Sequence, residues 1–178
     1  MAELWIALKD LPAEGREFSF TDQSLWTDRF QDFGLVCHPG RGVSATALVQ
    51  PQGRGCLVTG SIEGSILVPC DRCAEEFEQT FAEEFTLFET LPGEGEEPDE
   101  ECRIREEGGH FALDAAAVLW EQFVLALPVK PLCSENCRGL CPRCGANLNE
   151  ESCACQEEGG DPRLAVLRGL KLSEPDDE

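Results

Sequence analysis

The sequence predicts an α+β protein in which an antiparallel sheet, open or barrel-like, is covered by a helix and followed by a cysteine-rich segment. Three observations support this fold class. Residues 1–90 contain short apolar or alternating runs separated by turn residues, a pattern typical of strands. Residues 111–127 carry apolar side chains at helical spacing. Six of the eleven cysteines then lie between Cys133 and Cys155, in loops rich in Gly, Pro and Asn.

The strands are expected in the first half of the chain, where runs of β-branched residues, or of alternating apolar and polar residues, are separated by turns that contain Gly or Pro. The last of them has Glu and Gln on a solvated face. Glu63-Gly64 predicts a tight hairpin within this region. The expected strands are 3–8, 16–20, 43–49, 56–62, 65–68 and 77–88.

Three helices are predicted. Apolar residues at helical spacing indicate a short helix over 24–33 that packs on the sheet. The strongest pattern is that of 111–127, where Asp114 can act as the N-cap and Pro128 ends the helix. Asp and Pro in succession then predict the start of a short terminal helix at 163–172.

The chain is expected to divide into a core domain and a smaller appendage. Residues 1–127 form the core, and 128–172 form the cysteine-rich segment with its terminal helix. An acidic tail follows at 173–178. Within the core, residues 92–109 are rich in Gly, Pro and acids and predict a flexible loop, with eight acids and two arginines in 92–107.

The charge balance limits the functions that the chain can have. With 35 acids against 14 bases, the formal net charge is −21. This argues against a broad nucleic-acid-binding face, because affinity for phosphate backbones comes mainly from Lys and Arg. A basic protein partner fits better, although surface acids also serve solubility alone. The amino terminus lacks the pattern of a signal peptide and no stretch is long enough to span a membrane, so a cytoplasmic protein without membrane contact is expected.

The cysteine-rich segment predicts a structural zinc site. Cys141 and Cys144 form a Cys-x-x-Cys knuckle followed by a glycine, and Cys153 and Cys155 face it across a short loop. A disulfide framework and a redox pair are the alternatives. An odd number of cysteines and a reducing compartment argue against disulfides. The absence of histidine from the segment argues against a catalytic zinc, which usually leaves one position open.

A second Cys-x-x-Cys lies in the first half of the chain, where a strand turns back. Cys70 and Cys73 need a partner pair, and Cys133 and Cys137 are available if the later four cysteines fill the first site. That arrangement gives two zinc ions, one of which clamps the tail onto the sheet. The alternative is that Cys70 and Cys73 are free thiols in a tight turn. The remaining cysteines, expected as small buried side chains, are Cys37, Cys56 and Cys102.

Five motifs occur in order along the second half of the chain. They are Cys70-Asp-Arg-Cys73, Leu127-Pro-Val-Lys-Pro-Leu-Cys133, Gly139-Leu-Cys-Pro-Arg-Cys-Gly145, Asn147-Leu-Asn149, and Asp161-Pro-Arg-Leu-Ala165 with Leu167. Over roughly residues 55–172 the chain thereby resembles the YceD family, the bacterial and plastid large ribosomal RNA subunit accumulation protein. The resemblance implies a role in accumulation or processing of the large-subunit (23S) ribosomal RNA. The family has no established catalytic activity, and some members lack the later cysteine cluster.

These observations together predict a non-catalytic ribosome-biogenesis factor that acts by binding. Its expected partners are a basic large-subunit ribosomal protein or assembly factor, 23S pre-rRNA, or both, and no small-molecule substrate is expected. The acidic surface would hold the basic protein. The candidate binding residues are Arg138 and Arg143 in the zinc segment and Arg72 in the first knuckle, because Arg pairs well with phosphate. The alternative for these arginines is ordinary solvation of a loop.

An enzyme is the competing interpretation, either a thiol redox protein or an RNA-processing enzyme that uses Cys70 and Cys73. A Cys-x-x-Cys can have a lowered thiol pKa, but Asp71 and the negative body oppose this lowering. The hydrolytic version lacks a convincing carboxylate pair in an ordered segment.

Overall fold

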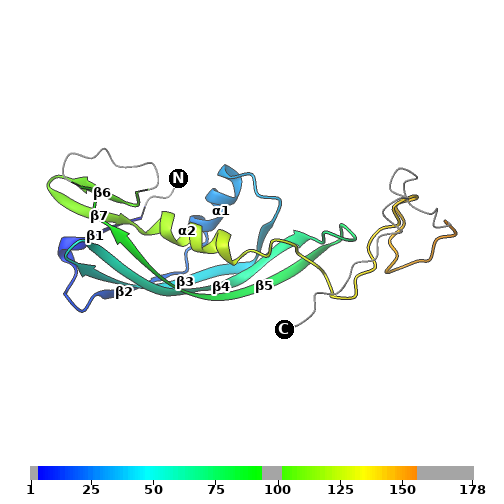
Figure 1. Cartoon of the computed structure of the whole chain (residues 1–178), viewed down its shortest axis with the longest axis horizontal. Coiled ribbons are helices and arrows are strands. Elements are labelled where there is room, and N and C mark those ends of the chain that lie inside the picture. Colours follow the sequence, from blue (N-terminus) through cyan, green and yellow to red (C-terminus); the bar gives the residue numbers. More distant parts are fainter. Residues whose placement is uncertain (1–3, 94–101, 156–178) are drawn as a thin grey trace, which may run out of the picture.

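The computed structural model describes residues 4–93 and 102–155 and has an α+β fold with two antiparallel sheets (Figure 1). The larger sheet has the strand order β2-β3-β4-β5 and the smaller one β1-β7-β6. Neither closes into a barrel in the part of the chain that is described. In chain order the elements are β1 (Trp5–Ala7), η1 (Leu8–Asp10), β2 (Arg16–Phe20), α1 (Ser24–Asp32), β3 (His38–Gln52), β4 (Gly55–Pro69), β5 (Glu76–Thr90), β6 (Ile104–Glu107), β7 (His110–Asp114) and α2 (Ala115–Ala126).

The three long strands β3, β4 and β5 form one continuous meander, each of 15 residues. The hairpin predicted at Glu63-Gly64 is wrong, since Glu63 lies in the middle of β4 and pairs with Ser44 and Ala82. Gly64 serves close packing instead of a turn. A Cβ at this position would lie 2.5 Å from the Gly42 carbonyl oxygen, and the neighbouring ring of Phe81 would be 3.2 Å away.

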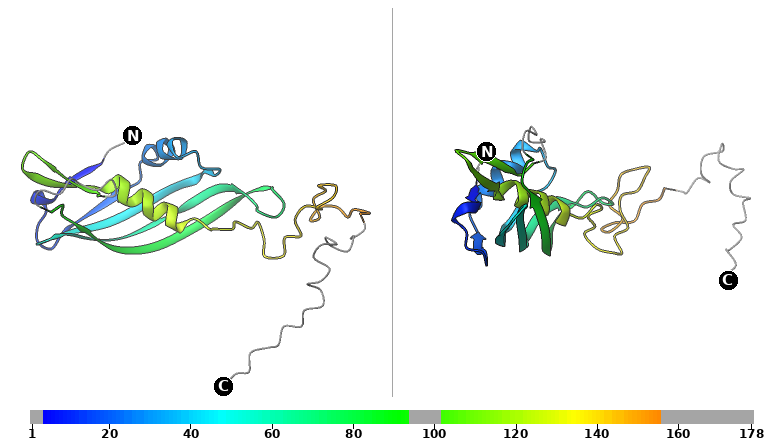
Figure 2. Two further views of the ribbon diagram at one scale, coloured as in Figure 1. Left: turned by 45° about the horizontal axis from the view of Figure 1, so that its top comes forward. Right: turned by 60° about the vertical axis from the view of Figure 1, so that its left-hand side comes forward.

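Both helices cover the same face of the large sheet (Figure 2). An aromatic cluster joins them, in which Phe123 of α2 packs against Phe30 of α1 at 5.1 Å and Phe81 of β5 at 5.6 Å between ring centroids. Trp26 and Trp120 complete the cluster. Burial of these large rings accounts for much of the core, because aromatic side chains remove the most apolar area from water. Neither helix of the described segments is long and apolar enough to cross a membrane.

Strands β6 and β7 lie where the sequence predicts the end of the 92–109 loop and the start of the 111–127 helix. β7 occupies the first residues of the predicted 111–127 helix because Leu113 pairs with both Ile6 and Ile104 and is fully buried between them. Asp114 is the N-cap as predicted, since its carboxylate accepts a hydrogen bond of 2.9 Å from the amide of Ala117. Residues 94–101 of the predicted acidic loop, the helix at 163–172 and the tail at 173–178 lie outside the described residues.

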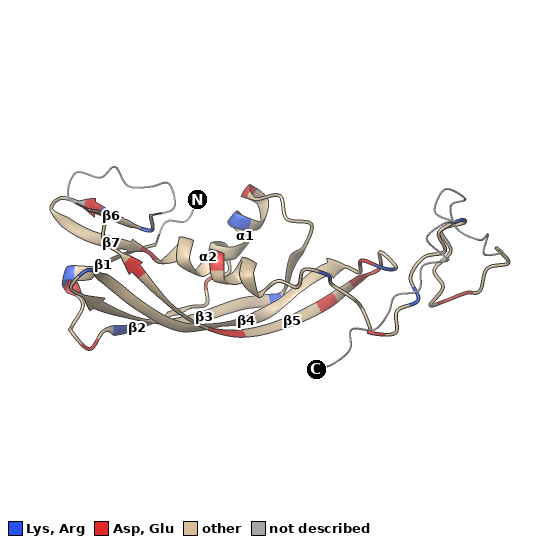
Figure 3. Ribbon diagram, viewed as in Figure 1, with Lys and Arg blue, Asp and Glu red and all other residues tan. Residues whose placement is uncertain are grey.

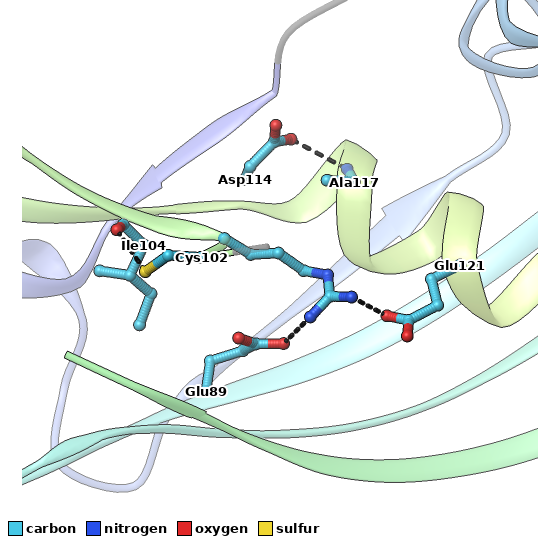
Figure 4. Close-up of polar contacts among 7 residues, drawn as sticks. Glu89, Cys102, Ile104, Asp114, Ala117 and Glu121 are labelled. Carbon is cyan, nitrogen blue, oxygen red and sulfur yellow. Dashed lines mark hydrogen bonds and ion pairs between the residues drawn. The ribbon is translucent and has the colours of Figure 1, made fainter. Parts of the chain in front are cut away.

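Arg103 holds the small sheet, the large sheet and α2 together (Figure 4). Its guanidinium pairs with Glu89 of β5 at 3.0 Å and with Glu121 of α2. Burial raises the pKa of the Glu89 carboxyl despite the attraction of Arg103. The two ion pairs of Arg103 therefore fix α2 and the small sheet against one end of the long β3–β4–β5 meander. The opposite end of the meander carries the first cysteine knuckle.

Candidate metal centre

The two Cys-x-x-Cys motifs adopt the same backbone conformation. In the first, the amide of Ala74 donates to the carbonyl of Cys70 at 2.8 Å, and in the second the amide of Gly145 donates to the carbonyl of Cys141 at 2.9 Å. The residue after the second cysteine is left-handed in both, with φ of +59° at Ala74 and +75° at Gly145. Such a turn directs backbone amides toward the sulfurs. The first knuckle is the turn that joins β4 to β5.

The first knuckle lies against two cysteines from the segment after α2, and we call this group site 1. Its members are Cys70, Cys73, Cys133 and Cys137, whose four Sγ atoms all lie within 4.8 Å of one another. The Sγ–Sγ distance is 3.8 Å from Cys70 to Cys137 and 3.7 Å from Cys73 to Cys133. A tetrahedral zinc with Zn–S bonds of about 2.3 Å requires sulfurs about 3.8 Å apart. The spacing of site 1 fits such an ion.

The second knuckle forms a separate group of four thiols, which we call site 2. Cys141, Cys144, Cys153 and Cys155 also bring their Sγ atoms within 4.8 Å of one another. Only Cys141 is buried, and Cys144 and Cys155 are exposed. Site 2 is therefore built from local sequence, whereas site 1 joins cysteines that are 60 and 67 residues apart.

The sulfurs of both groups are arranged as the ligands of a metal site, and none of them is joined to another in a disulfide bond. All eleven cysteines are free thiols. The 3.7 Å and 3.8 Å separations in site 1 are far longer than the S–S bond of about 2.05 Å. Four soft sulfurs in a compact group favour zinc among common ions. Cys37 and Cys56 are buried away from both groups, as expected for structural side chains.

Hydrogen bonds to sulfur make the thiols of each group unequal. Burial raises the pKa of the Cys70 thiol, but backbone amides, that of Cys133 first, outweigh burial and lower this pKa to about 6. In site 2 the amide of Cys144 is the main cause that lowers the pKa of Cys141 to about 6. Burial and neighbouring sulfurs raise the pKa of Cys133 to about 12. A bound cation would favour the thiolate at all four positions.

Arg72, between the two cysteines of the first knuckle, holds site 1 together. Its Nη1 donates to the carbonyls of Glu135 and Cys137, both at 2.9 Å. Its own carbonyl accepts from the amide of Leu140 at 2.9 Å. The side chain is exposed, so Arg72 lies at the surface while it fixes the loop that supplies Cys137.

Asn149 connects the two sites. It lies in the loop between the cysteine pairs of site 2, yet its Nδ2 donates to the Sγ of Cys137 in site 1 at 3.3 Å. Its Oδ1 accepts from the amide of Arg138 at 2.8 Å, and its Nδ2 also contacts Asn147 at 2.9 Å. A short bridge between Leu140 and Asn147 runs alongside. Hydrogen bonds that orient a thiolate usually support metal affinity.

Replacing Asn149 by Ala is expected to weaken metal binding at site 1 by about tenfold, because second-layer partners typically contribute 10–100-fold to affinity. Competition with a chromophoric chelator measures the affinity of each site. Glu150→Ala is the matched control, since the Glu150 side chain is exposed and only its backbone amide bonds within the loop. Equal affinities for the two variants would show that Asn149 does not support Cys137.

The structure thus brings together the eight cysteines singled out from the sequence, in two groups of four. Arg138 and Arg143 are exposed on the same segment. Sequence reasoning did not find the role of Asn149. The only signal is its place in an Asn-Leu-Asn run, which by itself resembles an ordinary turn.

Comparison with known proteins places the chain in a family. The model of the family described as large ribosomal RNA subunit accumulation protein YceD matches residues 58–171, a stretch that contains both cysteine groups. The chain belongs to the YceD family.

Curated relatives of this YceD family member come from bacteria and plants. An uncharacterized protein of Mycobacterium tuberculosis is 31% identical over 123 residues, which are 67% of this chain and 57% of the relative. The chloroplastic large ribosomal RNA subunit accumulation protein YCED homolog 1 is 30% identical over 139 residues in Zea mays, covering 62% of this chain and 47% of the relative. The Arabidopsis thaliana protein of the same name is 26% identical over 143 residues, covering 63% and 43%. The chain spans about half the length of these relatives, and no solved structure matches it.

Proposed function

We propose that the protein is a non-catalytic factor for accumulation of 23S ribosomal RNA, which acts by binding during assembly of the large subunit. Membership of the YceD family supports the role in ribosomal RNA accumulation, and the double four-cysteine module at the end of the sheet supports a role without catalysis. Four thiolates complete the tetrahedral coordination of zinc and leave no position for a water nucleophile. The module therefore suits a structural role, in which one or two zinc ions hold a loop surface in shape.

The surface of this module carries the candidate contacts to RNA or protein. The described cysteine-rich segment, residues 128–155, which we call the arm, carries basic as well as acidic residues (Figure 3). Arg138 and Arg143 are exposed there, and Arg72 adds a third exposed guanidinium beside site 1. Arginine pairs bidentately with phosphate and also suits protein interfaces. We therefore assign these three residues to the proposed contact with pre-rRNA or a large-subunit protein.

Reversing the charge at Arg138 and Arg143, each to Glu, is expected to weaken co-sedimentation with pre-large-subunit particles by about tenfold, since each phosphate contact adds to affinity. Arg16→Glu together with Arg54→Glu is the matched control, because it makes the same charge change at two exposed residues away from the arm, on β2 and on the β3–β4 turn. Metal content should be the same in all variants. Unchanged co-sedimentation of the double variant would remove the arm from the proposed interface.

The acidic body is the proposed binding surface for a basic ribosomal or assembly protein. The net charge of −21 favours rapid association with a cationic partner and disfavours contact with RNA outside the arm. Such a factor works where ribosomes are assembled, and for this chain we propose the cytoplasm.

A thiol redox enzyme is the second candidate, because the pKa of Cys70 is lowered to about 6 and another sulfur lies 3.8 Å away. Reduction of a disulfide substrate by the metal-free protein, and loss of this activity in Cys70→Ser, would favour the redox enzyme. A metal-loaded protein without such activity would favour the binding role.

A further inference from the structure

β5 forms one edge of the large sheet. The strand order ends at β5, and β5 pairs with β4 from Glu76 to Thr90. Within residues 4–93 and 102–155, no strand pairs with the other side of β5. About half of the backbone N–H and C=O groups of an antiparallel edge strand point away from its neighbour. The border of the sheet formed by β5 is visible in both views of Figure 2.

This edge lacks most devices that proteins use to prevent strand addition. Native edge strands are commonly short, or carry Pro, charged side chains or a bulge, and of these devices β5 has the charged side chains, all of them glutamates. β5 has 15 residues, contains no Pro, Gly or Lys, and keeps an unbroken register with β4. A long, regular edge of this kind is a template for another strand.

The charge of β5 restricts which strand can be added. It carries five glutamates and no basic residue. Glu78 is paired with Arg41 at 2.7 Å, and Glu89 is paired with Arg103. The other three glutamates are exposed and form no ion pair with a described residue. These are Glu76, Glu83 and Glu84.

Like charges directly opposite one another destabilise a strand pair, so a second copy of β5 is a poor partner for this edge. A strand rich in Lys or Arg is a good one. Next to Glu84 the outer face of the sheet has an open hollow of about 520 Å³, bordered by the hydroxyls of Thr59, Ser61 and Thr86. Ser61 pairs with Glu84 and Thr59 with Thr86, so these side chains share one face. The hollow has room for a long cationic side chain.

We propose that the free edge of β5 binds an extended, Lys- and Arg-rich segment of a protein partner by β-strand addition. Backbone hydrogen bonds to the edge supply affinity, and basic side chains at alternate positions of the added strand lie on the outer face beside Glu84. This rests on the proposed function, in which the partner is a basic ribosomal or assembly protein, and it specifies where that partner binds.

The test uses a labelled peptide of alternating Lys and Thr residues, as long as β5, and the full chain. We expect binding by fluorescence anisotropy and slower amide hydrogen exchange in 76–90. The same peptide N-methylated at alternate residues keeps its charge but loses the donors along one edge, and it should bind about tenfold more weakly. Glu84→Lys should weaken binding, whereas Glu17→Lys on β2, an exposed residue with the same charge change, should leave it unchanged within about twofold.

Equal binding of the N-methylated peptide, or unchanged exchange in 76–90, would mean diffuse charge attraction and would overturn the proposal. Co-sedimentation with pre-large-subunit particles separates this from the proposed function. If wild type and Glu84→Lys co-sediment equally, the edge is not the binding site while the function stands. If wild type does not co-sediment, the proposed function fails, and the peptide experiment still decides whether the edge accepts a basic strand.

Discussion

Replacing Cys70 and Cys73 by Ser is expected to lower the metal content of protein purified without chelator from about two ions per chain to about one, because serine does not replace thiolate as a zinc ligand. Site 1 loses two of its four sulfurs, and site 2 keeps all of its own. Elemental analysis by mass spectrometry gives the number and the identity of the ions.

Cys102→Ser is the control for this experiment. Cys102 lies outside both groups, and a serine hydroxyl can replace its contact with the carbonyl of Ile104. If wild type and the double variant both contain about one ion per chain, Cys70 and Cys73 do not bind metal. Absence of metal from wild type as well would favour the redox interpretation.

Phe123→Ala is expected to lower the free energy of unfolding by about 3–5 kcal/mol, the usual cost of deleting a buried aromatic ring. Phe123 is fully buried and contacts rings from α1, β5 and its own helix. Its removal leaves a cavity where the helices meet the sheet. Urea unfolding followed by tryptophan fluorescence measures the change.

Val124→Ala provides the matched control on the next residue of α2. Val124 is 42% exposed, and alanine is the better helix former, so the expected change is below about 0.5 kcal/mol. Similar losses for both variants would contradict the central place of Phe123 in the core.

The fold class could be predicted from the sequence because the long strands and α2 each have a clear local pattern of apolar residues. Alternation marks the strands, and apolar spacing together with Asp114 marks α2. The hairpin at Glu63-Gly64 was wrong because Gly64 is needed for contact with neighbouring strands, which local turn statistics do not include. β6 was missed because four residues in an acidic segment become a strand only through pairing with β7.

The candidate site divides in the same way. Short spacing was enough to group the cysteines of site 2. For site 1 the sequence left two alternatives, because the pairing of Cys70 with Cys137 depends on where α2 returns the chain. The hydrogen bond from Asn149 to the Cys137 sulfur depends on the same return and has no local signature.

The location of the first knuckle at the β4–β5 turn has a consequence for the whole domain. A metal ion shared by Cys70 and Cys137 would be a cross-link between positions 67 residues apart, and the enclosed ring would contain β5, β6, β7 and α2. In the chain-entropy model, a closed ring of this length lowers the entropy of the unfolded chain by an amount equivalent to about 4 kcal/mol. The supply of metal would then change the free energy of unfolding of the whole domain, including strands that lie far from the ion.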